Sequence, residues 1–224
     1  MRKKGTSHIE IILAFVLFVS VVIFMLYFFN PASSSKNLIP SAIQLAQDKI
    51  IENTNTEVEF YSVKISGGGA IVALDDISAG YKAAAFDLNG NQVKASVADL
   101  NKVKIEKDGF IFLVLSEDIE ETLVANEPTG SYEIASTSTR KIISEKKLKE
   151  LKEGYSQNYE QTKERLLIPS GLDFSFNAIL NNEKIISAER EIPLKVEVFA
   201  QSKRIEMIKS NGEVASAYLE VKVW

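Results

Sequence analysis

The sequence contains few of the residues that enzymes use as nucleophiles, bases or metal ligands. It has no cysteine, and its single histidine, His8, stands just before a long hydrophobic segment. The rest of the chain therefore cannot form Ser-His-Asp or Cys-His nucleophilic sites, or zinc sites built on histidine or cysteine. The lack of cysteine also excludes disulfides and a lipid-modified cysteine anchor. We expect no catalytic activity, no bound metal and no cofactor.

Pairs of neighbouring carboxylates are what remains for acid–base chemistry. The pairs are Asp75-Asp76, Glu117-Asp118 and Glu120-Glu121. Adjacent residues on a strand point to opposite faces of a sheet, and adjacent acids in a loop are usually solvated. We interpret these residues as surface charges.

Two turns have part of the pattern of a ligand-binding loop. Residues 87–91 read Asp-Leu-Asn-Gly-Asn, but Ala98 stands where a calcium loop of this kind needs a bidentate glutamate. Residues 66–69 read Ser-Gly-Gly-Gly, but no Lys-Ser/Thr pair or helix follows, as a phosphate-binding loop would need. Both stretches predict turns between strands, and Asn89-Gly90 favours a hairpin.

The charge of the chain also limits its partners. The net charge is −4. Nucleic-acid binding usually requires a basic patch, so we expect no nucleic-acid partner.

A hydrophobic segment dominates the N-terminal region. Residues 11–29 contain no charged residue and follow the cations Arg2, Lys3 and Lys4. As a helix, this segment would be about 28 Å long, close to the thickness of the hydrocarbon core of a bilayer. It predicts a single transmembrane helix with a cytoplasmic N-terminus and an extracytoplasmic C-terminal domain, so that the lipid bilayer is an expected partner.

After this segment the pattern changes from apolar to mixed. Residues 30–39, which include Pro31 and three consecutive serines, predict a linker. A short helix then follows from Pro40, which suits a first helical turn. Its apolar residues Ile43, Ala46 and Ile50 fall on one face. The pattern fits either a continuation of the first helix after a kink or a separate element lying on the domain.

The remainder predicts a β-rich domain. We expect strands near 58–65, 70–74, 83–88, 92–97, 110–115, 131–137, 172–180 and 193–200, and a final hairpin that joins 204–208 to 214–224. The C-terminal Trp224 is expected to fill the core of this domain.

One amphipathic helix interrupts the strands. Leu148, Leu151 and Tyr155 lie on one helical stripe within residues 145–166, with Ser144 as a candidate N-cap. Gly154 marks a possible kink within this helix. The predicted fold class is therefore α+β: an N-terminal transmembrane helix, followed by a β-rich extracytoplasmic domain with one inserted amphipathic helix.

The first ten residues carry a further signal. Gly5 closes the basic stretch, and Glu10, the fifth residue after it, is the only acidic residue next to the hydrophobic segment. This pattern resembles the class III signal of type IV pilins and pilin-like proteins, including archaeal ones. The position after Gly5 is Thr6, where the family more often has a bulky or amide residue. The predicted break at Pro31 also differs from the continuous helix of major pilins.

The resemblance implies a processing and assembly pathway. A prepilin peptidase would cut after Gly5, and Thr6 would become the N-terminal residue of the mature chain. The carboxylate of Glu10 would meet the new amine at Thr6 of a neighbouring subunit, and the apolar helices would pack together in a filament core. The expected partners are then the peptidase and other copies of the chain.

The expected organisation has four parts: a cytoplasmic leader at 1–5, a transmembrane and assembly helix at 6–29, a linker at 30–39 and an extracytoplasmic β-rich domain at 40–224. A pilin-like cell-surface subunit, structural or accessory, is the leading functional hypothesis. The alternatives are a signal-anchored surface protein that binds a partner without forming filaments, an exported protein cut near residues 32–35, and an extracellular enzyme.

Overall fold

The computed structural model describes residues 6–28, 31–74, 77–99, 101–125 and 127–224 of the chain. Side chains are not described for residues 6–9, 26–28 and 31–39. The chain divides into two compact units, Met1–Ala42 and Ile43–Trp224.

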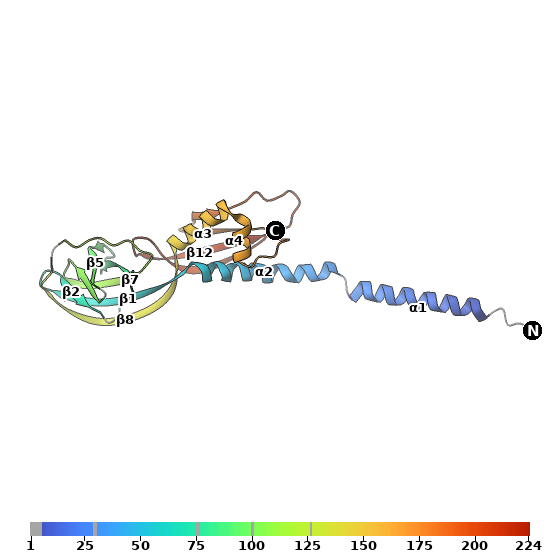
Figure 1. Cartoon of the computed structure of the whole chain (residues 1–224), viewed down its shortest axis with the longest axis horizontal. Helices are drawn as coiled ribbons and strands as arrows, with labels where there is room; N and C mark the ends of the chain where they lie inside the picture. The colour runs from blue at the N-terminus through green and yellow to red at the C-terminus, as the bar shows by residue number, and fades with distance from the viewer. Residues whose placement is uncertain (1–5, 29–30, 75–76, 100, 126) are drawn as a thin grey trace, which may run out of the picture. The chain divides into compact units, whose positions relative to one another are not determined.

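The N-terminal region is helical. Helix α1 spans Thr6–Phe28 and helix α2 spans Pro31–Thr54 (Figure 1). No helix in the described parts of the chain combines the length and the apolar character needed to span a membrane. This finding contradicts the predicted transmembrane helix.

Helix α2 differs from its prediction in where it begins. It starts at Pro31, so that residues 31–39 are helical and do not form the predicted linker. Pro31 suits the first turn because its missing N–H has no partner there in any helix. Pro40 lies inside the helix, not in its first turn. The predicted apolar face is confirmed, since Ile43, Ala46 and Ile50 are all buried.

The second unit is built mainly from strands. The strands are β1 Asn55–Ser66, β2 Ala70–Ala73, β3 Lys82–Asp87, β4 Gln92–Val93, β5 Ala95–Asp99, β6 Lys102–Ile105, β7 Gly109–Ser116, β8 Ser131–Ser144, β9 Phe174–Leu180, β10 Glu183–Ala188, β11 Phe199–Ile208 and β12 Val214–Val223. Nine of them form one sheet in the order β10-β9-β12-β11-β8-β1-β7-β3-β4, and three form a second sheet in the order β2-β6-β5. The predicted class, α+β with one inserted helix, is therefore wrong: the structure is mostly β-sheet.

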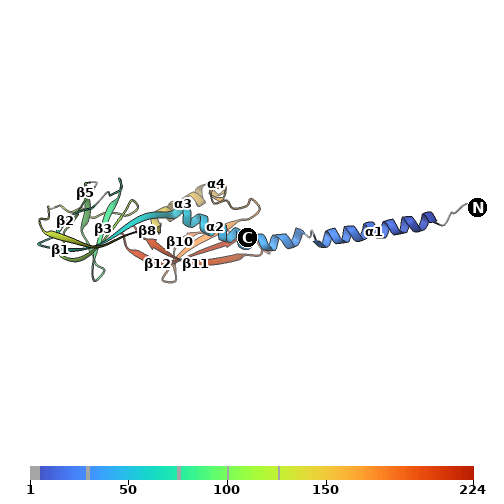
Figure 2. The ribbon, with the colours of Figure 1, turned by 90° about the horizontal axis from the view of Figure 1, so that it is seen from below.

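The large sheet has two parts, which differ in what covers them (Figure 2). In the first part, β1 is hydrogen-bonded to β7 on one side and to β8 on the other, antiparallel in both cases. The three-stranded sheet packs against this part. Val63 of β1, Val103 of β6 and Leu113 of β7 are fully buried in the core that results.

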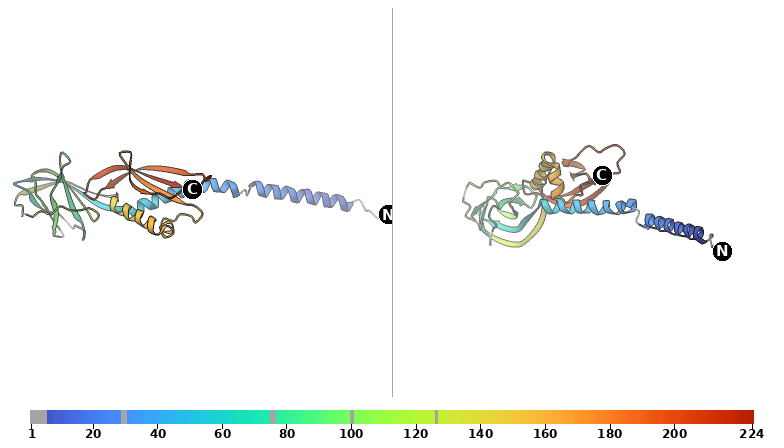
Figure 3. Two further views of the ribbon diagram at one scale, coloured as in Figure 1. Left: turned by 90° about the horizontal axis from the view of Figure 1, so that it is seen from above. Right: turned by 45° about the vertical axis from the view of Figure 1, so that its right-hand side comes forward.

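The second part of the sheet contains β9 to β12 and is covered by helices. Helix α3 spans Glu145–Gln157 and helix α4 spans Tyr159–Arg165. Figure 3 shows these helices on one face of the strands coloured orange and red. Tyr155 of α3 meets Phe174 and Phe176 of β9 edge to face, with ring centroids 5.2 and 6.0 Å apart. Helix α2 also contacts this part, because the Gln47 side chain donates to the carbonyl of Leu219, 3.1 Å away.

The helix predicted at 145–166 is present but divided. Its predicted N-cap is confirmed: the Ser144 hydroxyl accepts a hydrogen bond from the N–H of Lys147 at 3.2 Å. The helix breaks at Asn158, which caps both neighbouring helices, and it continues unbroken through Gly154. The break follows from the Asn158 side chain, which offers the backbone an alternative to the helical hydrogen bond.

The two parts of the sheet meet at a short junction. Strands β8 and β11 pair in parallel only through Met207 with Ile143 and Ile208 with Ser144. The predicted C-terminal hairpin is confirmed, with β11 and β12 paired over ten residues each. Trp224 is buried as expected.

Candidate functional site

Two of the three predicted carboxylate pairs lie in the described residues, and both form contacts within the chain. Asp75-Asp76 lies outside the described residues. Lys147 of α3 donates to Glu117 at 2.9 Å and lies 3.2 Å from the buried Asp118. Burial of Lys147 opposes its charge, but hydrogen bonds and charges from Glu117 and Asp118 outweigh burial and raise its pKa. This second pair therefore fixes the start of α3.

The third pair has a similar structural role. The Glu121 side chain accepts a hydrogen bond from the N–H of Val97 at 3.1 Å. The N–H of Glu120 donates to the carbonyl of Ser210 at 2.6 Å. The Glu121 side chain thus contacts β5, and the Glu120 backbone contacts the turn between β11 and β12. Over the described ranges, no group of three or more acidic, histidine or cysteine residues could hold a metal ion.

The Asp87 loop closes on itself. The Asp87 carboxylate accepts hydrogen bonds from the N–H groups of Asn89 and Asn91, both at 2.9 Å, and from Lys107 at 2.7 Å. The Lys107 contact and the bonds from the turn hold the pKa of Asp87 well below its usual value. The loop is a hairpin turn, as the sequence predicts, because its carboxylate oxygens are occupied by the chain itself.

The glycine-rich turn binds a carboxylate of the same chain. Three successive backbone N–H groups, of Gly67, Gly68 and Gly69, donate to Asp108 at 3.2, 2.8 and 2.9 Å. These bonds lower the pKa of Asp108. A Cβ at Gly69 would lie 2.5 Å from the Ile105 carbonyl oxygen, so only glycine fits there. No local sequence pattern links Asp108 to this turn, because the two lie about forty residues apart.

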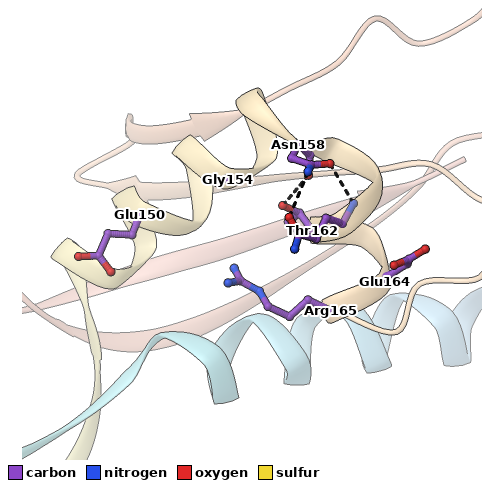
Figure 4. A pocket seen from close by; sticks show the side chains of 7 residues that line it. Glu150, Gly154, Asn158, Thr162, Glu164 and Arg165 are labelled. Carbon is purple, nitrogen blue, oxygen red and sulfur yellow. Dashed lines mark hydrogen bonds between the residues drawn. The ribbon is translucent and has the colours of Figure 1, made fainter.

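A polar hollow of about 410 Å³ lies beside α3 and α4 (Figure 4). It is lined by Glu150, Gly154, Asn158, Gln161, Thr162, Glu164 and Arg165. Figure 4 shows the carboxylates of Glu150 and Glu164 pointing away from each other, so they cannot act as an acid–base pair. The Thr162 hydroxyl donates to the Asn158 carbonyl at 3.0 Å. This bond stabilises the first turn of α4, next to the helix break.

The aromatic residues under these helices also have structural partners. The Tyr155 hydroxyl donates to the carbonyl of Phe174 at 2.6 Å, and the Tyr159 hydroxyl donates to Asp173 at 2.8 Å. Burial raises the pKa of both phenols, that of Tyr159 to about 12. Both groups therefore stay protonated and act as hydrogen-bond donors within the core.

The surface of α1 is the most unusual feature of the first unit. Large apolar side chains on every side of this helix are exposed, among them Leu13, Phe15 and Phe18 at 65–66%. The hydroxyl of Ser20 donates back to the carbonyl of Val16 at 2.7 Å, so it does not create a polar face. A helix that is apolar on all sides is stable only when other apolar groups cover it.

The predicted site residues lie at the start of this helix. Gly5 is outside the described residues, and Thr6 is the first residue of α1. Glu10 is exposed on α1. The structure thus places Thr6 and Glu10 on one helix, one turn apart. It does not test their roles in processing or assembly.

Comparisons of the chain with protein-family models, with curated proteins and with solved structures found no match. The resemblance of the first residues to a pilin-type signal is therefore not borne out by these comparisons.

Proposed function

We propose that the chain is a pilin-like structural or accessory subunit of a cell-surface filament, and that it assembles through α1. The observation that carries the proposal is the exposed apolar surface around the whole circumference of this helix. Burying apolar surface contributes about 25 cal/mol per Å². Copies of α1 packed side by side would cover one another along their whole length.

Glu10 supports the same proposal. A carboxylate beside an apolar helix is costly to bury unless a cation meets it. By its resemblance to prepilins, the chain would be cut after Gly5 by a prepilin peptidase, which would leave an amine at Thr6. Pairing of that amine with Glu10 of the next copy would set the axial position of each subunit. The β-rich unit would then face outward from the cell.

The first test is the mature N-terminus. After co-expression with a prepilin peptidase, intact-mass measurement should show a chain that begins at Thr6. Replacing Gly5 should leave Met1 in place. An unmodified chain that still begins at Met1 and stays monomeric would contradict the proposal and would favour a surface protein that binds its partner without filaments.

The second test is the role of the Glu10 carboxylate. Glu10→Gln keeps the shape of the side chain but removes its charge. A charge-assisted hydrogen bond contributes about 1.5–3 kcal/mol, so the yield of sedimentable filaments should fall by about tenfold or more. Processing at Gly5 should remain.

The matched control is Ser20→Ala on the same helix. It removes a hydroxyl that is bonded only to its own helix turn in the described structure, so filament yield should stay unchanged. Equal yields from Glu10→Gln and Ser20→Ala would show that the carboxylate has no part in assembly.

A further inference from the structure

A buried asparagine lies on the face of the second part of the large sheet that α3 does not cover. Phe176 of β9 packs against Tyr155 of α3, so Asn177, the next residue of the strand, points to the opposite face. Asn177 is nevertheless fully buried. Ser187 of β10 and Glu220 of β12 stand opposite it on the two neighbouring strands. Polar residues of three strands thus enclose one carboxamide group.

Side chains bind both ends of this carboxamide. The Ser187 hydroxyl donates to Oδ1 of Asn177 at 2.8 Å. The amide nitrogen Nδ2 donates to Glu189 at 3.0 Å and to Glu220 at 3.1 Å. A hydrogen bond to the carbonyl oxygen stabilises the negative charge that forms there when a nucleophile attacks the carbon Cγ. The carbonyl is therefore polarised, and its nitrogen is held by two carboxylates.

A lysine shares one carboxylate oxygen with this amide. Nζ of Lys222 lies 3.2 Å from Oε2 of Glu220, the same atom that accepts from Nδ2 of Asn177 at 3.1 Å. The two nitrogens are therefore separated by at most the sum of these distances, 6.3 Å. The side chains of Lys222 and Glu220 are only 27% and 25% exposed. Oε2 is thus placed to move a proton from one nitrogen to the other.

Glu220 is in the ionised form that this proton transfer needs. Burial acts to raise the pKa of Glu220, but hydrogen bonds from Asn177 and Lys222 outweigh burial and hold the pKa below its ordinary value. An ionised carboxylate in contact with an ammonium group can act as its general base.

The second lysine near Asn177 is less suited to react. Lys184 is ion-paired with Glu189, and these two side chains are 47% and 46% exposed. The hydrogen bond with Glu189 raises the pKa of Lys184. Its amine therefore stays protonated and in contact with water, and Lys222 is the better candidate for a nucleophile.

We propose that Lys222 and Asn177 form an intramolecular isopeptide bond. Glu220 takes a proton from the Lys222 ammonium, and the neutral Nζ attacks Cγ of Asn177. The Nζ–Cγ bond forms and the Cγ–Nδ2 bond breaks. The two protons that Nζ gives up pass by way of Glu220 to Nδ2, which leaves as ammonium. No atom is oxidised or reduced, and the protein loses one positive charge.

The bond would give the chain a covalent link that it cannot obtain from disulfides, because it contains no cysteine. It would join β9 to β12 and close the segment between them into a loop, which lowers the entropy of the unfolded chain. The reaction takes place once in each chain, so a small fraction of neutral Lys222 is enough. This inference goes beyond the proposed assembly and does not depend on it.

Mass spectrometry of the purified full-length chain under denaturing conditions tests the bond. The intact mass should be about 17 Da below that of the unlinked chain with the same N-terminus, because one ammonia is lost. A succinimide at Asn89-Gly90 or Asn211-Gly212 would give the same loss, so tryptic peptides must locate the change. Peptide 166–184, which contains Asn177, should be joined to peptide 210–224, in which trypsin no longer cuts after Lys222.

Three variants assign the roles of the side chains. Lys222→Arg should abolish the linked peptide. Lys184→Arg is the matched control, since it makes the same change at the other lysine near Asn177, and it should keep the linked peptide. Glu220→Gln keeps the shape of the side chain but removes the base, so the linked fraction should fall at least about tenfold. Circular dichroism of each variant should match that of the parent chain.

The outcomes are distinct. A parent chain without the 17 Da loss, or without the linked peptide, would show an ordinary hydrogen-bonded asparagine and overturn the inference. A link from Asn177 to Lys184 would overturn the choice of Lys222. A parental linked fraction in Glu220→Gln would overturn the role of its carboxylate. Filament formation is not a readout here, so failure of either proposal leaves the other standing.

Discussion

Asp108 joins two turns that lie about forty residues apart. It holds the Gly67–Gly69 turn through three backbone N–H groups, and its neighbour Gly109 begins β7. The anionic form of a carboxylate accepts these bonds better than the protonated form does, which is why its pKa falls. The same logic applies to Asp87 in its hairpin.

A stability prediction follows for Asp108. The lowered pKa means that the carboxylate contributes stability above about pH 4, the ordinary aspartate pKa, and that this contribution is lost as pH falls towards the lower folded-state value. Asp108→Asn should lower the melting temperature at neutral pH. It should also flatten the fall in melting temperature between about pH 4 and pH 2.

Thermal unfolding followed by circular dichroism across this pH range is the measurement. Asp99→Asn is the matched control, because Asp99 is exposed on β5 with Lys102 4.0 Å away. An Asp108→Asn protein with the same acid dependence as the parent would show that the turn does not depend on the charge.

Single residues were predictable where their partners are close in sequence. The Asn89-Gly90 turn and the Ser144 cap involve residues two to four positions apart, and local geometry determines such bonds. The partner of the glycine turn was not predictable, because no local pattern links Gly68 to Asp108. Lys147 was missed for the same reason: its contacts with Glu117 and Asp118 depend on the packing of α3 against the sheet.

At the scale of elements, α3 is the clearest amphipathic helix. Leu148, Leu151 and Tyr155 are buried on one side, while its lysines and glutamates are largely exposed on the other. Packing of an amphipathic face supplies most of the stability of a helix of this length.

Leu148→Ala should therefore destabilise the second unit. The Leu148 side chain is fully buried, and truncation of a buried leucine costs about 2–5 kcal/mol. Urea unfolding should show this loss. Lys152→Ala, on the exposed face of the same helix, should stay within about 0.5 kcal/mol of the parent. Similar losses in both variants would contradict the packing described for α3.

The elements show why sequence patterns predict some strands and not others. Strands β7 and β12 have long apolar patterns that predict them well. Strand β10 was missed, and residues 193–198, predicted as part of a strand, form a loop before β11. Both errors arise because alternating apolar residues specify a possible strand but not a hydrogen-bonding partner.

For the whole molecule, the order of the strands in the sheet could not be predicted from the sequence. The pairing of β9 with β12 and of β8 with β1 joins segments that are far apart in the chain. The apolar pattern of β1 did not show which strands would flank it. The sequence nevertheless indicated a β-rich unit after about residue 55, and the structure bears out this coarser expectation.

The second unit should fold without the first. A chain of residues 41–224 keeps Ile43, Ala46 and Ile50, the buried residues of α2, together with both sheets. It should unfold cooperatively on heating, like the same unit within the full chain. A truncated chain without a cooperative transition would contradict the division into units.

The direct passage from α2 to β1 has a mechanical consequence. Helix α2 ends at Thr54 and β1 begins at Asn55, with no loop between them. Tension applied through this end of the helix would enter a strand held on both sides by antiparallel neighbours. Pulled along its length, β1 would load many hydrogen bonds at once in shear, so they would fail together at high force. The two-residue contact between β8 and β11 would yield first and act as an extensible link.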